Sequence, residues 1–86
     1  MSNSITTESL QTMAIHQIAD IIKGDWKKVN YGAVPYLQAM RQMESPDTMY
    51  GFDSGKSIIL YFLSNATSWR GAVAKLVKAH LKAICK

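Results

Sequence analysis

The chain has 86 residues, of which 48% are hydrophobic and 19% charged, and its formal net charge is +4. That length accommodates a single domain, residues 1–86, with one modest core, and that composition excludes a disordered chain. The longest apolar run, from Ile58 to Leu63, is far shorter than the roughly 20 residues that span a membrane. The single cysteine, Cys85, and the lack of a secretory signal favour the cytoplasm.

The first predicted helix begins near Thr7 and ends at Gly24. The hydroxyl group of Thr7 can cap the free amides at the start of the helix, and Lys23 complements the dipole in its last turn. One buried stripe is indicated by hydrophobic residues that recur three or four positions apart: Leu10, Met13, Ala14, Ile18, Ile21 and Ile22. We expect residues 1–6 to be flexible.

A second helix is predicted from about Ala33 to Met43. Before it, Asp25 is expected to cap a short turn that carries Trp26. After it, Ser-Pro-Asp at residues 45–47 predicts a turn, and Tyr-Gly-Phe at residues 50–52 predicts an aromatic loop.

The third predicted element runs from Lys56 to about Ser64 and is capped by Asp53 or Ser54. It contains the apolar run 58–63, whose periodicity does not distinguish a buried strand from a central helix. We predict a helix, because the sequence offers no second convincing strand and a lone strand would leave its backbone groups unpaired.

The last predicted helix follows Ser68, whose hydroxyl group can cap it. Its buried face is predicted to carry Trp69, Ala72, Val73, Leu76, Val77, His80, Ala83 and Ile84. The opposite face carries lysines three or four positions apart. These elements predict an all-α fold, a compact bundle of about four helices.

Positive charge is concentrated in the second part of the chain. Up to Asp53, four bases stand against six acids, whereas from Ser54 onward there are six bases and no acid. Side chains spaced to contact phosphates predict one alternative function, nucleic-acid binding by Lys56, Arg70, Lys75, Lys78 and Lys82. A lysine-rich face is also the usual solvated side of an amphipathic helix, so the pattern alone leaves both interpretations open.

Aromatic residues near the helix junctions predict a contact surface for another protein. Most of them, Tyr31 included, are expected to pack within the fold, but tyrosine and tryptophan also anchor interfaces. If Tyr50 and Phe52 are exposed beside Arg41, these three residues are the first candidates for contact with a partner.

We therefore expect a non-catalytic interaction protein that binds a protein partner, and homodimerisation is a further expectation. A small structural subunit of a larger assembly is the remaining alternative.

Two local patterns invite a chemical interpretation and do not support it. Residues 51–57, Gly-Phe-Asp-Ser-Gly-Lys-Ser, are one residue short of a phosphate-binding loop and follow no hydrophobic strand, which favours a capped helix start. His16 and Asp20 lie four positions apart, but a metal site needs three or four ligands. We expect no metal, no cofactor and no enzymatic activity, because no nucleophile, base and orienting group form a recognisable set.

Several short segments together resemble a family of small phage- or prophage-encoded helical proteins of unknown function. They are Asp25-Trp26-Lys27, Pro35-Tyr36-Leu37, Tyr50-Gly51-Phe52-Asp53-Ser54, Tyr61-Phe62-Leu63-Ser64-Asn65-Ala66 and Trp69-Arg70-Gly71, followed by the helix from Lys75 to Lys82. The resemblance implies no catalytic residues. It implies a context in which short proteins commonly act by occluding a host protein, for example a component of a defence system.

Overall fold

The computed structural model describes residues 6–47, 49–50 and 53–85, and the predicted all-α class is confirmed there. The elements in chain order are α1 (Thr7–Gln11), α2 (Ile15–Asp25), the 3-10 helix η1 (Tyr31–Ala33), α3 (Val34–Met40), the paired two-residue strands β1 (Met49–Tyr50) and β2 (Asp53–Ser54), α4 (Gly55–Ser64) and α5 (Ala72–Ile84). The expected flexibility of the first residues falls mostly outside these ranges. None of the helices within them is long and apolar enough to cross a membrane.

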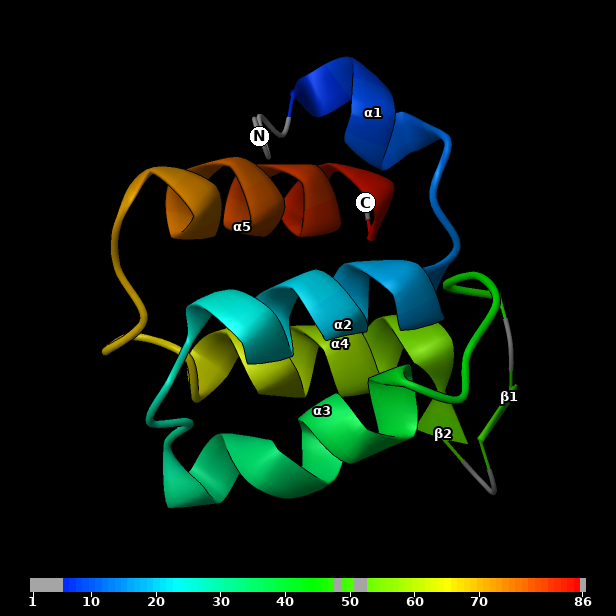
Figure 1. Ribbon diagram of the computed structural model, residues 1–86. Helices are drawn as coiled ribbons and strands as arrows, with labels where there is room; N and C mark the ends of the chain where they lie inside the picture. The colour runs from blue at the N-terminus through cyan, green and yellow to red at the C-terminus, as the bar shows by residue number, and fades with distance from the viewer. Residues whose placement is uncertain (1–5, 48, 51–52, 86) are drawn as a thin grey trace.

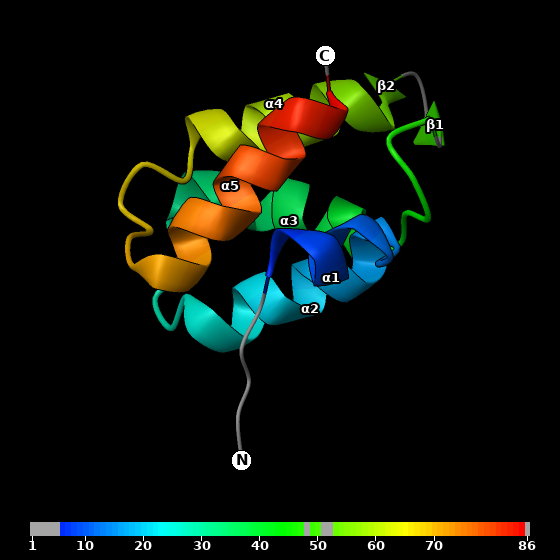
Figure 2. The ribbon, with the colours of Figure 1, turned by 90° about the horizontal axis from the view of Figure 1, so that it is seen from above.

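The helices pack around one core. Figure 1 shows α2 and α4 between α5 on one side and α3 on the other. Seen from above, the short α1 lies next to α5 (Figure 2), and these two helices are in contact. As a result, α3 and α5 present their outer surfaces on opposite sides of the molecule.

The prediction of a single helix from Thr7 to Gly24 was wrong, because α1 ends at Gln11 and α2 begins only at Ile15. The predicted N-cap residue, Thr7, is also wrong by one position. Thr6 caps α1, because its extended backbone brings its hydroxyl group within 3.1 Å of the Ser9 N–H. The Ser9 hydroxyl in turn accepts the N–H of Thr6, so the cap is reciprocal.

A loop remote in sequence fixes the start of α2. The N–H of Ile15 donates to the carbonyl oxygen of Glu44 at 3.0 Å, and the N–H of His16 donates to that of Met43 at 2.8 Å. The first amides of a helix have no partner within the helix, and here the loop after α3 supplies the acceptors. The interruption between α1 and α2 is therefore a tertiary feature.

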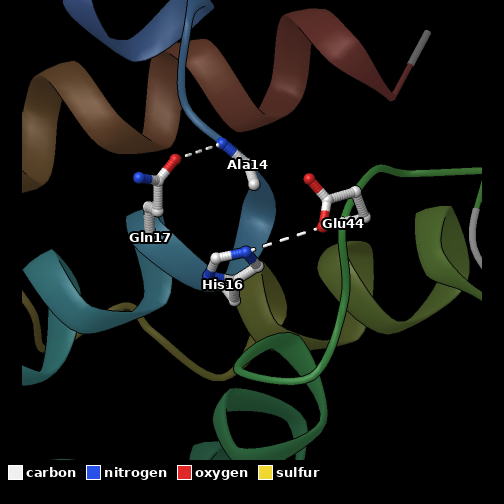
Figure 3. A network of polar contacts seen from close by, with 4 residues as sticks. All are labelled: Ala14, His16, Gln17 and Glu44. Atoms are coloured by element: carbon white, nitrogen blue, oxygen red, sulfur yellow. Dashed lines mark hydrogen bonds and ion pairs between the residues drawn. The ribbon is translucent and has the colours of Figure 1, made fainter.

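Side chains complete this junction. Gln17 accepts a hydrogen bond at 2.8 Å from the N–H of the residue that precedes α2, and His16 Nε2 lies 3.6 Å from Glu44 Oε1 (Figure 3). Asp20 lies 3.5 Å from Arg41 Nε. The two residues considered as a metal pair, His16 and Asp20, thus face different partners on the α3 side.

The second predicted helix is shorter than expected. It was predicted from about Ala33 to Met43, whereas α3 ends at Met40 after starting as the 3-10 turn η1. The N–H of Gln42 donates to Ala39 and that of Met43 to Met40, both three residues back, so the chain tightens and leaves the helix. This exit brings the Met43 carbonyl to the start of α2.

The apolar run is helical, as predicted, within α4. Ser54 is the cap, and its hydroxyl oxygen accepts the N–H of Ser57 at 3.2 Å. The N–H of Lys56 donates to the carbonyl oxygen of Pro46 at 3.0 Å. Two of the amides in the segment that resembled a phosphate-binding loop, those of Lys56 and Ser57, are therefore engaged within the fold.

The prediction that Ser68 caps the last helix was wrong, because α5 begins at Ala72 and its N-cap is Gly71. Gly71 has a φ of 119°, which residues with a side chain rarely adopt. Since Trp69 lies outside the helix, the buried face also differs from the predicted one. Ala72 and Ala83 are exposed, and the buried residues are Ala74, Val77, His80 and Leu81.

Three aromatic rings fix the junctions of α2, α4 and α5. Trp26 stacks on Trp69 with ring centroids 5.9 Å apart and meets Phe62 edge to face at 6.1 Å. The indole N–H of Trp69 donates to Asp25 at 2.8 Å. Asp25, predicted to cap a turn, is instead the last residue of α2 and holds the segment that leads into α5.

Burial of His80 predicts a pH-dependent stability. The side chain is only 8% exposed, and burial lowers the pKa of its imidazole below the ordinary value of 6.5. The unfolded chain therefore binds more protons in mild acid than the folded one, so the His80 contribution is complete above about pH 6.5 and declines as the pH falls below it.

We expect the midpoint of urea unfolding to be lower at pH 5.5 than at pH 7.5 in the native chain. His80→Gln should remove most of the difference, whereas His16→Gln, at the more exposed of the two histidines, should retain it. A native midpoint that does not change between these pH values would contradict the assignment.

Candidate functional site

Four of the predicted nucleic-acid-binding residues lie along one side of α5 and just before it. We call Arg70, Lys75, Lys78 and Lys82 the basic cluster. Arg70, Lys75 and Lys82 are exposed, and Lys78 is half-buried between them. A hollow of about 280 Å³ at the start of α5 is lined by three of them together with Trp69, Gly71 and Ala74. Arg70, Lys75 and Lys78 therefore border a concave surface, and Lys82 lies beyond it along α5.

Lys78 is the fixed member of the basic cluster. Its ammonium group donates to the backbone carbonyl of Trp69 and lies 5.8 Å from the centroid of the Trp69 ring, within the range of a cation–π contact. Burial, followed by the positive charges of Lys82 and Arg70, lowers the pKa of Lys78 from its ordinary value. The effect of these two neighbours means that the charges in the cluster are close enough to repel one another.

None of the four cations forms an ion pair with a carboxylate in the described part of the chain. The two ion pairs found there, His16 with Glu44 and Arg41 with Asp20, both lie between α2 and the α3 region. No acidic residue occurs anywhere after Asp53. The nearest carboxylate that the hydrogen bonds record, Asp25, accepts the indole N–H of Trp69 and is not paired with a cation of the cluster.

Lys56 was predicted to act with the basic cluster, and the structure places it near the C-terminal end of α5. It lies in the first turn of α4, and its carbonyl oxygen is 4.0 Å from the sulfur of Cys85. Cys85 follows the C-terminal end of α5, a helix about 20 Å long, whereas Arg70 precedes its start. The structure therefore separates Lys56 from Arg70 by about the length of α5, whereas Lys82 lies in the last turn of α5, at the Cys85 end.

The residues predicted to bind a protein partner are only partly described. Arg41 is exposed directly after α3 and faces Asp20. Tyr50 belongs to β1, but its side chain lies outside what the structure describes, as does Phe52 altogether. An aromatic contact surface at these residues stays a prediction.

A second concave surface, which the sequence did not predict, runs along α3. We call it the α3 groove. It consists of three adjoining hollows that share Gln38 and are otherwise lined by Lys23, Val29, Tyr31, Gly32, Val34, Pro35, Leu37, Arg41 and Gln42. Tyr31 lies at one end and is 92% exposed, so the expectation that it packs within the fold was wrong. No periodicity signals this surface, because η1, α3 and the end of α2 each contribute only a few of its residues.

A scan against protein-family models, a search of curated proteins and a search of solved structures each found no match to this chain. The resemblance to small phage-encoded proteins therefore stays a prediction. Within the described residues, the basic cluster and the α3 groove are two surfaces that could meet a partner.

Proposed function

We propose that this protein is a non-catalytic interaction protein that binds the phosphate backbone of a nucleic acid through the basic cluster. The observation that carries the proposal is the gathering of four cationic side chains along one side of α5 and just before it, none of which forms an ion pair with a described residue. Phosphates would neutralise this charge and release condensed counterions into solution, which is the main source of sequence-independent affinity.

The spacing of the lysines suits a phosphate backbone. Lys75, Lys78 and Lys82 follow one another at three and four positions on a helix, so neighbouring Cβ atoms are about 5–6 Å apart. Lys78 is already held by the Trp69 carbonyl, which reduces the entropy lost on binding. Arg70, exposed at the edge of the hollow, can hold a phosphate with two parallel hydrogen bonds.

The same surface offers little for reading a base sequence. Trp69, the aromatic residue of the hollow, is only 2% exposed and its ring is stacked on Trp26, so it is not free to stack on a base. Contacts to phosphates position a protein on nucleic acid without selecting a sequence. We therefore propose binding that depends on the phosphate backbone and little on base composition.

Salt dependence tests the proposal. The affinity for a fluorescein-labelled 20-base-pair duplex is measured by anisotropy at 50 and 200 mM KCl. If all four cations of the basic cluster contact phosphates, the affinity should fall roughly 150-fold between these concentrations, because each contact contributes a slope of about −0.9 in log affinity against log salt concentration. Lys82→Gln should weaken binding and make the slope shallower by about one unit.

Lys23→Gln is the matched control, since it removes the same charge from α2, on the α3 side of the molecule. It should leave the slope unchanged. Failure to bind the duplex at 50 mM KCl would overturn the proposal, as would equal effects of Lys82→Gln and Lys23→Gln. Binding of poly-glutamate as tight as that of the duplex would point to an acidic protein instead.

A further inference from the structure

The α3 groove is lined mainly by η1 and α3, and α3 lies on the other side of α2 and α4 from α5, the helix that carries most of the basic cluster (Figure 1). Its three hollows have volumes of about 400, 230 and 420 Å³ and follow one another from Tyr31 to Gln42. Gln38 lines all three, so the hollows adjoin one another along α3. This surface is independent of the proposed nucleic-acid contact.

The middle of the α3 groove is apolar. Val29 and Val34 are half-buried and Leu37 is almost fully buried, so together they form the floor of the central hollow. Tyr31 extends from one end with 92% of its surface in water. An exposed tyrosine next to an apolar hollow is a typical anchor for a protein partner, because its ring contributes a large contact area at low entropic cost.

The charged side chains that line the α3 groove are positive. Lys23 and Arg41 are its charged lining residues, and no carboxylate lines any of the three hollows within the described ranges. Asp20 lies 3.5 Å from Arg41 Nε, but both side chains are largely exposed, and ion pairs of this kind contribute little. The remaining N–H groups of the Arg41 guanidinium can accommodate a further carboxylate.

We infer that the α3 groove is the docking surface for an acidic amphipathic segment of a partner protein. An apolar side chain of that segment occupies the hollow over Val34 and Leu37, and its carboxylates pair with Lys23 and Arg41. Charge complementarity selects this occupant over a basic or neutral segment. Because α3 and α5 lie on opposite sides of α2 and α4, both surfaces can be occupied at once.

The inference is tested with a library of random 12-residue peptides displayed on phage and selected on the immobilised full chain. The recovered peptides should combine at least two Asp or Glu residues with a neighbouring Leu, Ile, Phe or Trp. Their synthetic forms should bind at least tenfold more weakly to Tyr31→Ser and to Lys23→Glu. Lys82→Glu makes the same charge change on α5 and should alter the affinity less than twofold.

The following results would contradict the inference. Recovery of no peptide, or of peptides that lack acidic residues, would overturn it, as would equal weakening by Lys82→Glu and Lys23→Glu. A dimer of the native chain in light scattering that Tyr31→Ser converts to a monomer would assign the groove to a second copy instead. Circular dichroism should show the native helix content in every variant, because all three substituted side chains are exposed.

Discussion

Trp69→Ala is expected to lower the free energy of unfolding by about 3–5 kcal/mol, as large-to-small substitutions of buried aromatic residues do. Trp69 is 2% exposed, stacks on Trp26 and donates to Asp25, so its removal opens a cavity and detaches the segment before α5. A domain of this size has about 5–15 kcal/mol in total. The loss is measured by urea unfolding followed by circular dichroism.

Trp69→Phe is the graded control. Phenylalanine keeps a ring against Trp26 but cannot donate to Asp25, so the loss should be smaller, about 1–2 kcal/mol. Tyr31→Ser, at an exposed aromatic residue, should change stability by less than about 0.5 kcal/mol. If Trp69→Ala lowered the free energy of unfolding by less than about 1 kcal/mol, the stacking of Trp69 on Trp26 would not hold the end of α2 against the segment before α5.

Gly55→Ala is expected to destabilise the fold by about 1–3 kcal/mol, which is the usual cost of overpacking. A Cβ atom at Gly55 would lie 2.7 Å from the carbonyl oxygen of Pro46 and 3.0 Å from that of Ser45. Both are backbone atoms, and the hydrogen bond from the Lys56 N–H to Pro46 holds this turn against the start of α4. The neighbouring chain therefore cannot move aside without losing that contact.

Gly24→Ala is the matched control, and we expect it to stabilise the fold, whereas Gly55→Ala destabilises it. Gly24 lies within α2, and nothing approaches within 4 Å of the position that its Cβ would take. Alanine there should stabilise the protein by about 0.4–1 kcal/mol, because it restricts the unfolded chain and favours the helix. Both substitutions are compared by urea unfolding at pH 7.5. A stabilising effect of both would contradict the close approach at Gly55.

Part of the candidate site was predictable from the sequence. The spacing of Lys75, Lys78 and Lys82 placed them on one side of a helix, and the lack of acidic residues after Asp53 was visible directly. The sequence did not reveal that Lys78 bonds to the Trp69 carbonyl, because that contact depends on how the chain turns before α5. The α3 groove was missed for a similar reason, since segments that are individually unremarkable form it.

By itself, the sequence determined the helical class of this protein, the helical state of the apolar run in α4 and the charged character of α5. These are local properties, because hydrophobic periodicity and charge spacing act within a few turns of one helix. The tertiary structure decided where α2 begins, through the carbonyls of Met43 and Glu44, and where α5 begins, through the stacking of Trp69 on Trp26. Hydrogen-bond acceptors and ring surfaces supplied by distant residues leave no trace in the local pattern, so only the folded chain could determine these boundaries.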